Sequence, residues 1–333
     1  MRLASYNVAW FDALFDDDGE LIDDPGWSSR YNITREQQTE ALSAVFQAID
    51  ADAVMIIEAP DTGRQRSTLK ALDAFVETYG LRTRAAVMGF ANETQQEIAL
   101  LYDPDVLKVV HDPQASVTAP RFDHEFEIDL DIDAHEDSVV FSKPPLELAA
   151  TAASGKKFRI IGAHLKSKAP HGARTREEAT RISIANRRKQ LAQAIWLRRR
   201  IETHLEAGES LILMGDLNDG PGLDEYEDLF GASSVEILVG EGAHKLYDAH
   251  AQDVMHNRFG PRHSSARFFI RQENRYLQAL LDYIMVSPDL REAARSWRIM
   301  HPFDDALCWS CEDLRDALLT ASDHFPVVLD IDL

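Results

Sequence analysis

The amino-acid sequence predicts an α/β (α+β) protein in which one β-sheet packs on another and helices cover the outside. The strands expected from the apolar pattern outnumber the helices, and they occur both in consecutive runs and between helices, which is typical of such layered folds. The chain has 333 residues, of which 45% are hydrophobic, so it can bury a sizeable core. Because no linker rich in Pro, Gly or Ser and no internal repeat interrupts it, we expect one domain over residues 1–333.

The first 60 residues predict a strand, a loop, a helix and a second strand. Leu3–Ala9 predicts the first strand, and the acidic residues 12–29 predict a surface loop. Thr34 and Gln37 match a capping box at the start of a helix. Ala53–Ile57 is a short, continuously apolar run that predicts a buried strand. The helix between them places four apolar residues on one stripe: Leu42, Val45, Phe46 and Ile49.

The rest of the chain continues the alternation of strands and helices. Ser67–Tyr79 predicts a helix that Gly80 closes at the usual C-terminal position. Arg176–Ala207 predicts a long helix that is rich in arginine. The other expected strands cover residues 82–87, 97–102, 106–110, Phe158–His164, Ser210–Gly215, Arg267–Ile270, Leu281–Val286 and Phe325–Ile331.

Acidic and apolar residues alternate between Phe122 and Asp133, with Phe126, Ile128, Leu130 and Ile132 on one face of the expected strand. One interpretation of the acids is a calcium site, and the other is a solvated sheet face or a charged edge that resists aggregation. We favour the second, because regular alternation spreads carboxylates along a strand rather than around an ion. The acids are Asp123, Glu125, Glu127, Asp129, Asp131 and Asp133.

Composition narrows the partners and the location that we expect. Lys and Arg number 35 against 56 Asp and Glu, a net charge of −21 that repels polyanions at long range but leaves room for a local basic groove. No charged segment followed by an apolar stretch opens the chain, and no run approaches the ~20 apolar residues of a membrane span. We therefore expect a cytoplasmic protein with no membrane span, and no obligate protein partner is evident.

The two cysteines, Cys308 and Cys311, form a Cys-x-x-Cys pair. A redox pair or half of a zinc site is one interpretation. A structural zinc site needs about four ligands, and the sequence has no second pair. Two ordinary thiols in a loop are therefore the favoured interpretation.

Side chains that can carry catalysis recur at the ends of apolar strands. An ionised carboxylate beside a buried strand is costly unless another group pairs it. A single example has a simple explanation as a turn or helix cap, but six examples together favour one common site. They are Asn7, Glu58, His164, Asp216 with Asn218, Asp282, and Asp323 with His324.

These segments resemble the endonuclease/exonuclease/phosphatase superfamily of metal-dependent phosphoesterases, which includes deoxyribonuclease-like enzymes. They occur in the family's order and span almost the whole chain. The resemblance implies a four-layer sandwich of two packed mixed β-sheets flanked by helices. The matching segments are Ser5-Tyr6-Asn7-Val8, Ile56-Ile57-Glu58, Gly162-Ala163-His164-Leu165-Lys166-Ser167-Lys168, Gly215-Asp216-Leu217-Asn218-Asp219, Leu281-Asp282-Tyr283-Ile284 and Ser322-Asp323-His324-Phe325-Pro326-Val327.

The resemblance also implies a role for each residue. Asn7, Glu58 and Asp323 resemble the metal-site residues, with Glu58 as the main ligand, and hard oxygen ligands of this kind suit Mg²⁺ or Mn²⁺. Asp216 resembles the residue that positions or deprotonates the attacking water. Asn218 resembles one that holds a phosphate oxygen.

Two histidines complete the implied machinery. His324 paired with Asp282 resembles an acid/base unit, in which the carboxylate fixes the tautomer and favours the imidazolium. His164 resembles the second histidine that contacts phosphate. Glu97 stands where the deoxyribonuclease branch keeps a carboxylate partner for that histidine.

Substrate-binding residues are harder to assign. Lys166 and Lys168 alternate beyond His164, and they either grip a phosphate or are solvated. Arg267 lies next to Phe268 and Phe269, so base stacking is one interpretation and a strand in the core is the other. The arginine-rich helix is either a nucleic-acid groove or a solvated face. Lys143 stands where a nuclease-like bacterial branch commonly carries Arg.

The leading hypothesis is a divalent-metal-dependent phosphodiester hydrolase that uses Mg²⁺ or Mn²⁺, with DNA or RNA as the substrate class. A phosphomonoesterase or a lipid or inositol-headgroup phosphoesterase is the alternative, which the net charge of −21 favours. A catalytically inactive phosphate-binding protein is the third hypothesis, and the presence of every core residue disfavours it.

Overall fold

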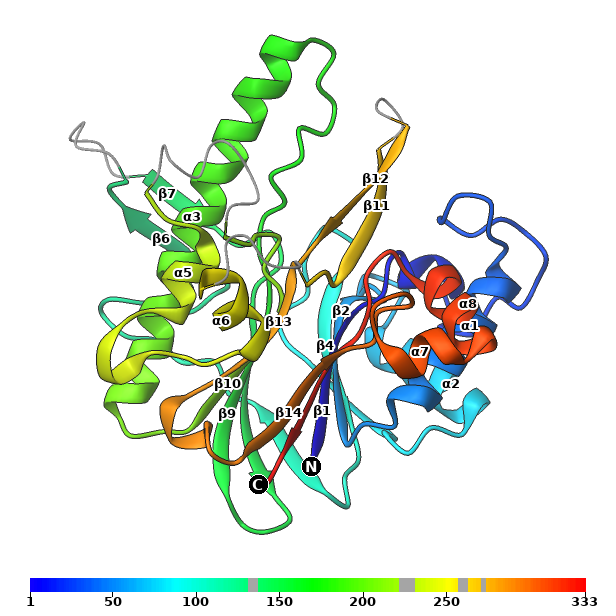
Figure 1. Cartoon of the computed structure of the whole chain (residues 1–333), viewed down its shortest axis with the longest axis horizontal. Coiled ribbons are helices and arrows are strands. Elements are labelled where there is room, and N and C mark those ends of the chain that lie inside the picture. The colour runs from blue at the N-terminus through cyan, green and yellow to red at the C-terminus, as the bar shows by residue number, and fades with distance from the viewer. Residues whose placement is uncertain (131–136, 222–230, 257–262, 271–273) are drawn as a thin grey trace.

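Two large mixed β-sheets pack face to face at the centre of the molecule, and helices cover the outer face of each (Figure 1). The structure is a computed structural model, and it describes all residues except 131–136, 222–230, 257–262 and 271–273. The predicted α/β sandwich, with layers in the order helices, sheet, sheet, helices, is confirmed.

The first sheet has six strands in the order β14-β15-β1-β2-β4-β3. Strand β1 lies at its middle, parallel to β2 and antiparallel to β15, so the first and last strands of the chain are neighbours. Residues 53–57 of β2 are buried on both faces, as the continuous apolar run predicts. The bounds are β1 Arg2–Asn7, β2 Ala53–Ala59, β3 Ala85–Met88, β4 Glu97–Tyr102, β14 Ala294–Ile299 and β15 Val327–Ile331.

The second sheet has five strands in the order β13-β10-β9-β8-β5. Strands β9 and β10 run parallel and the other pairs are antiparallel. The two sheets come very close at Gly162, where a Cβ atom would collide with Met55 and touch Ile98 of the other sheet. The bounds are β5 Leu107–His111, β8 Leu146–Ala152, β9 Lys157–His164, β10 Leu211–Asp216 and β13 Asp282–Val286.

The helices fall into two groups, α1, α2, α7 and α8 beside the six-stranded sheet and α3, α5 and α6 beside the five-stranded sheet (Figure 1). The capping box at Thr34 and Gln37 is present, and Ser67 and Gly80 cap the second helix as predicted. The bounds are α1 Arg35–Ile49, α2 Thr68–Tyr79, α3 Arg176–Glu206, α5 Ser234–Val239, α6 Ala249–His256, α7 Ala306–Ser310, α8 Glu312–Ala321 and the 3₁₀ turns η1 Phe11–Leu14, η2 Gly242–His244 and η3 Pro288–Leu290.

Two hairpins lie outside the large sheets. The β11–β12 hairpin (Ala266–Ile270 and Arg275–Ala279) and the N-terminal end of α3 both extend beyond the sheets toward the top of Figure 1. The second hairpin pairs β6 (Glu125–Ile128) with β7 (Asp137–Val140).

The alternating acidic segment forms a strand only over β6. Phe126 and Ile128 are buried there while Glu125 and Glu127 are exposed, which agrees with a solvated sheet face rather than a calcium site. Asp123 is engaged by Arg121 at 2.6 Å. The remaining residues of the predicted alternation, Asp131, Ile132 and Asp133, lie outside the described residues.

The cysteines carry no disulfide: Cys308 is buried, Cys311 is exposed and both are free. Cys308 lies in the short helix α7 rather than in a loop. Its Sγ lies 3.6 Å from a guanidinium nitrogen of Arg298, so it belongs to the packing of that helix.

Candidate active site

Strand register brings three of the predicted residues side by side. In the five-stranded sheet, Asp216 at the end of β10 pairs with His164 at the end of β9. On its other side it pairs with Asp282 at the start of β13. The three side chains come from segments up to 118 positions apart (282 − 164), and only the sheet register makes them neighbours.

The six-stranded sheet supplies the other half of the site. Asn7 ends β1, and Glu58 lies near the end of β2 with a left-handed backbone (φ 63°). Ser322 fixes the turn before β15, because its Oγ donates to the Asn7 carbonyl at 2.8 Å and accepts from the His324 N–H at 3.1 Å. Asp323 and His324 are thereby held against the end of β1.

Side chains of the two sheets meet directly. Asn7 Nδ2 donates to Asp216 Oδ2 at 3.0 Å, and His324 Nδ1 lies 2.8 Å from Asp282 Oδ2. Nε2 of His324 and Nε2 of His164 lie 3.9 Å and 3.6 Å from Asp216 Oδ2. All five residues are buried, so the structure brings this part of the predicted site together in a place where charges interact strongly.

The two histidines differ in charge. Burial by itself would lower the pKa of His324, but the carboxylates of Asp282 and Asp216 outweigh it and raise that pKa to about 10. Burial lowers the pKa of His164 well below its usual range, and the nearby ammonium group of Lys143 adds to the effect. His324 is therefore an imidazolium at neutral pH, while His164 is neutral.

The pKa values of two carboxyl groups of the site, Asp216 and Glu58, are raised. Burial raises the pKa of Asp216 to about 7, and the charge of Asp282 adds to the rise while His324 opposes it. Burial also raises the pKa of Glu58, against the positive charge of Lys143. Both carboxyl groups would be easier to ionise beside a cation.

Two buried oxygens of the site are available to a cation. Asn7 Oδ1 and Asp282 Oδ1 have no hydrogen-bond partner among the described residues. Ligand atoms of Asp216, Asp282 and His324 lie within 4.8 Å of one another, but an imidazolium has no free lone pair to bind a metal. The oxygens of Asn7 and Glu58, with Asp323 beside them, fit a hard divalent cation better.

Asn218 supports Asp216. Its backbone N–H donates to Asp216 Oδ1 at 2.8 Å, and its side-chain amide donates to Asp216 Oδ2 at 3.2 Å and to the Leu165 carbonyl at 3.0 Å. Its backbone is left-handed (φ 51°), which Asn tolerates better than most residues. In this arrangement the amide holds the carboxylate in place.

Two of the predicted site residues have other partners. Glu97 accepts hydrogen bonds from Asn92, at 2.5 Å and 3.2 Å, rather than from His164, and His164 Nδ1 lies 3.2 Å from Lys143 instead. Lys168 donates to the buried Asp219 at 2.6 Å, so it supports the loop after β10. The expected pairing of Glu97 with His164 is wrong, because the sequence does not show which tertiary partner a charged residue meets.

The other two predicted substrate-binding residues remain near the site. Lys166 is half-buried, and its charge contributes to lowering the pKa values of His164 and Lys143, in both cases after burial, the largest cause, so its ammonium group lies near them. Arg267 donates its backbone N–H to the Asp323 carbonyl at 2.7 Å. Phe268 packs edge-on against the ring of His324 at 5.4 Å.

The α3 arginines divide into buried and exposed groups. Arg187, Arg198 and Arg200 are buried and bind internal oxygens, including Asp219 and the Leu238 and Ala119 carbonyls. Arg181 is exposed near the N-terminal end of the helix. The helix is therefore neither a continuous basic groove nor a wholly solvated face.

Sequence reasoning missed Gln96. Its amide donates to Glu58 Oε2 at 2.8 Å, and its carbonyl accepts from Lys143. The chain Glu58–Gln96–Lys143–His164 thus connects the predicted metal side of the site to the histidine. A glutamine directly before the predicted strand at 97–102 was the available signal.

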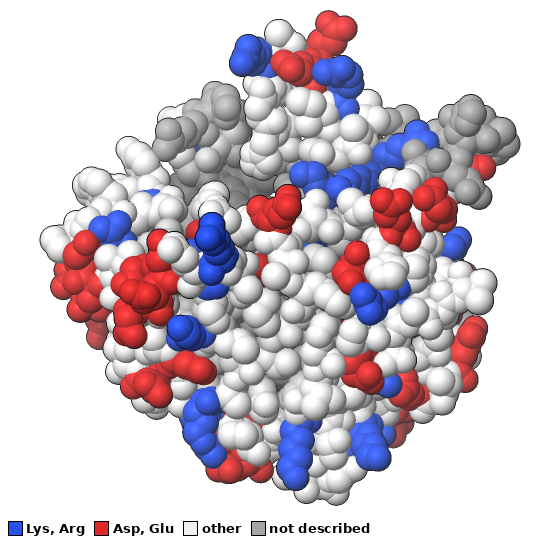
Figure 2. All heavy atoms as spheres, turned by 180° about the vertical axis from the view of Figure 1, so that it is seen from behind, with Lys and Arg blue, Asp and Glu red and all other residues white. Residues whose placement is uncertain are grey.

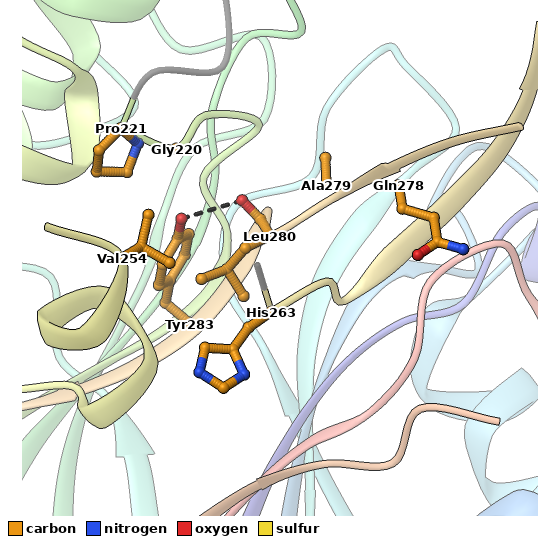
Figure 3. Close-up of a pocket in the computed structure, with 8 residues that line it drawn as sticks. All are labelled: Gly220, Pro221, Val254, His263, Gln278, Ala279, Leu280 and Tyr283. Carbon is orange, nitrogen blue, oxygen red and sulfur yellow. Dashed lines mark hydrogen bonds between the residues drawn. The ribbon is translucent and has the colours of Figure 1, made fainter. Parts of the chain in front are cut away.

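A pocket opens beside the loops that follow Asp219 and precede Asp282 (Figure 3). Tyr283 points toward Leu280, and its hydroxyl donates to the Leu280 and Asp219 carbonyls at 3.0 Å. Among the described residues, the lining consists of Gly220, Pro221, Val254, His263, Gln278, Ala279, Leu280 and Tyr283.

A fold of this kind with a buried Asp–His site at the sheet ends defines a class of phosphoesterases, and the comparisons agree. A model of the Endonuclease/Exonuclease/phosphatase family matches residues 4–324. The chain therefore belongs to this family, whose members are metal-dependent, and it is an enzyme that hydrolyses phosphate esters. No curated protein matches the chain.

Solved structures share the fold at low sequence identity. The 3'-5' exonuclease NExo from Neisseria meningitidis is 15% identical, with a TM-score of 0.52 and 100% of both chains covered. A truncated TDP2 from Caenorhabditis elegans is 14% identical, with a TM-score of 0.51, and 98% of this chain and 96% of that chain are covered. A Bacteroides thetaiotaomicron family member is 16% identical, with a TM-score of 0.51 and 100% and 98% covered.

Within the described part of the chain, no helix has the length and apolar character that crossing a membrane requires.

Proposed function

We propose that this enzyme hydrolyses phosphodiester bonds in nucleic acid, DNA or RNA, with Mg²⁺ or Mn²⁺. The observation that carries the proposal is the buried junction of the two sheets. There Asp216 is surrounded by Asn7, the charged His324 and the neutral His164, next to the oxygens that would hold the cation. Bound at Asn7, Glu58 and Asp323, the cation would supply charge that polarises the phosphoryl group.

The chain's own groups divide the chemistry between them. Asp216 accepts a proton from the attacking water, which a carboxyl group with a pKa of about 7 does efficiently near neutral pH. The His324 imidazolium, held by Asp282, donates hydrogen bonds to the phosphate as negative charge builds on it. Neutral His164 contacts the other side of the phosphate, and Asn218 keeps Asp216 in position.

Lysines beside His164 support a polyanionic substrate. The charge of Lys166 contributes to lowering the pKa values of Lys143 and Lys189, in both cases after burial, the larger cause. An anion that binds between such ammonium groups offsets their mutual repulsion and favours their charged forms. Lys189 Nζ lies 3.4 Å from Ser142 Oγ, which ties the group to the loop that carries Lys143.

The charge of this region is opposite to that of the rest of the chain. Residues 165–190 contain eight Lys or Arg and two Asp or Glu, a formal charge of +6 in a chain of −21, so the remainder carries −27. Two of the eight, Lys168 and the buried Arg187, pair with Asp219, which leaves the others to form the cationic surface. Figure 2 shows a band of Lys and Arg side chains beneath the projecting end of α3, with acidic side chains just below it. A local cationic surface of this kind attracts the phosphate backbone although the whole protein is acidic.

Two neighbours support the substrate class by analogy. NExo has been solved with a product DNA hairpin, at a TM-score of 0.51. Zebrafish (D. rerio) TDP2 has been solved with a single-strand DNA product, at a TM-score of 0.50. The competing candidate is a phosphomonoester, a lipid headgroup or an inositol phosphate, which the overall charge of −21 favours.

A substrate panel tests the proposal. Plasmid DNA, single-stranded DNA and RNA, inositol phosphates, sphingomyelin and bis-p-nitrophenyl phosphate are each incubated with Mg²⁺, Mn²⁺ or chelator. We expect metal-dependent cleavage of a nucleic acid and of the small diester, which Asp216→Ala and His324→Ala abolish without unfolding the protein. Cleavage of the headgroup or inositol substrates alone would refute the nucleic-acid substrate and favour the competing candidate.

Two further expectations stay predictions: the single domain over residues 1–333 and the cytoplasmic location.

A further inference from the structure

Exposed aromatic side chains form a ridge beside the catalytic His324. We call it the aromatic ridge and define it as Phe269, Tyr276, Phe303 and Trp309, which are 49%, 49%, 40% and 56% exposed. The first two belong to the β11–β12 hairpin, Phe303 to the loop before α7, and Trp309 to α7. Large aromatic groups exposed together mark a binding surface more often than isolated ones do.

The side chain of Arg267 lies between the rings of Tyr276 and Phe303. The guanidinium carbon of Arg267 lies 3.3 Å from the ring centroid of Tyr276 and 5.5 Å from that of Phe303. Phe303 and Trp309 are 6.3 Å apart, and Phe269 and Tyr276 are 5.1 Å apart. The ridge is therefore a continuous series of flat groups from two segments that are distant in the sequence.

The ridge is continuous with the catalytic centre. Arg267 donates its backbone N–H to the Asp323 carbonyl at 2.7 Å, and Ala266 forms a bridge with His324. Phe268, whose side chain lies on the opposite face of β11 from Arg267 and Phe269, packs against the His324 ring. Strand β11 thus borders the catalytic turn through its backbone, and a group bound at Arg267 would lie close to Asp323 of that turn.

The positive charge of Arg267 is not paired with a carboxylate of the described residues. Its Nε is also buried without a hydrogen-bond partner among them. In a chain with 56 acidic and 35 basic residues, most arginines find a carboxylate. A free guanidinium between aromatic rings suits a ligand that offers both flat rings and negative charge.

We infer that the aromatic ridge is a stacking subsite for unpaired nucleobases adjacent to the phosphate that is cleaved. This inference rests on the proposed function and narrows it to single-stranded nucleic acid, or to duplex ends with unpaired bases. Every nucleobase has a flat face that stacks on Tyr or Trp whatever its identity, and Arg267 would pair with the neighbouring phosphate. Bases paired inside a duplex cannot present their faces in this way.

Binding can be measured apart from catalysis. Two fluorescein-labelled DNA strands of equal length, one with bases and one fully abasic, are titrated with the protein in chelator and followed by anisotropy. The strands carry the same phosphates, so their difference in affinity isolates the contribution of the bases. We expect the wild-type protein to bind the strand with bases about 5- to 100-fold more tightly.

Variants of the aromatic ridge test whether its side chains cause this difference in affinity. Trp309→Ala and Tyr276→Ala should each remove most of the preference for bases, whereas Trp309→Phe and Tyr276→Phe should keep most of it. Val110→Ala, at an exposed position of β5, is the matched control and should bind as the wild type does. Circular dichroism confirms that each variant is folded.

Two results would overturn the inference. One is equal affinity of the wild-type protein for the two strands, and the other is an unchanged preference in the Ala variants. Loss of binding to phosphatidylcholine vesicles in the Ala variants, with no base preference, would instead assign the ridge to a lipid surface. Hydrolysis of bis-p-nitrophenyl phosphate in Mg²⁺ tests the proposed function separately, since that small diester does not need the ridge.

Discussion

Replacing Asp282 with Asn tests the charge state that the structure gives to His324. Asp282 Oδ2 lies 2.8 Å from His324 Nδ1, and both side chains are almost fully buried. The pKa of His324 is about 10, against a usual value of 6.5, although burial alone would lower it. Without the Asp282 carboxylate, only Asp216 and Asp323 oppose the effect of burial, so the pKa of His324 should fall and less of it should be protonated at pH 8.

The rate should fall by the amount that general acid or electrostatic catalysis supplies, about 10²- to 10⁴-fold. The assay is kcat for bis-p-nitrophenyl phosphate from pH 6 to pH 10 at saturating metal. The deficit of Asp282→Asn should shrink toward pH 6, where more of the variant's His324 is protonated.

The control is Asp289→Asn, which removes a half-exposed carboxylate that binds only Ser210, Ser287 and Lys156 in the structure. It should keep the wild-type rate and pH profile. Asp282→Asn activity within threefold of the wild type at pH 8, in a folded protein, would refute the role of the imidazolium.

Three further predictions concern substrate binding and stability. Lys166→Met should raise KM for an oligonucleotide about 10-fold, whereas Lys168→Met should lower the free energy of unfolding by roughly 1–3 kcal/mol; urea titrations and initial rates would show the reverse pattern if the two roles were exchanged. For Asp305, burial would raise the pKa, but Arg298 and the Cys308 N–H outweigh it and lower the pKa from 3.8 to about 2. Its ionised form should therefore contribute up to roughly 2 kcal/mol above pH 4, which is lost as the pH falls through 2; a Tm difference between the wild type and Asp305→Asn that persists below pH 2 would contradict this. Calorimetry of residues 1–333 should show one unfolding transition, and two separate transitions would contradict a single domain.

Elements with strong local signals were predictable from the sequence. The capping box at Thr34, the glycine cap at Gly80 and the apolar run of β2 each carry their signal within a few residues. Strand β8 (Leu146–Ala152) was missed because Glu147 interrupts its apolar run. That buried carboxylate is paired by His204, 2.6 Å away on α3, by Arg200 at 3.6 Å and by the Gln114 N–H at 2.9 Å. Helix α7 is too short for a helical period to show.

The part of the site that lies at the ends of strands was predictable from the sequence. Asp216, His164 and Asp282 were expected together because polar groups after apolar strands collect at one edge of a sheet, and the register confirms their proximity. The pairing of Glu97 with His164 was wrong, because Glu97 meets Asn92 instead, a contact that the sequence pattern does not show. The contact of Lys168 with Asp219 was likewise invisible in the sequence, and its role in substrate binding stays a prediction. Gln96 and the α7 part of the aromatic ridge carry no local motif.

The central claim is that the oxygens of Asn7, Glu58 and Asp323, at the end of the six-stranded sheet that faces Asp216, hold a divalent cation that hydrolysis of a phosphodiester requires. The most direct measurement is the rate of bis-p-nitrophenyl phosphate hydrolysis by metal-stripped protein as Mg²⁺ or Mn²⁺ is added back, for the wild type and Glu58→Gln. We predict no hydrolysis in chelator, full recovery with metal, and a metal requirement raised at least about 10-fold in Glu58→Gln. Hydrolysis that persists in chelator, or the same metal requirement in both proteins, would contradict the account.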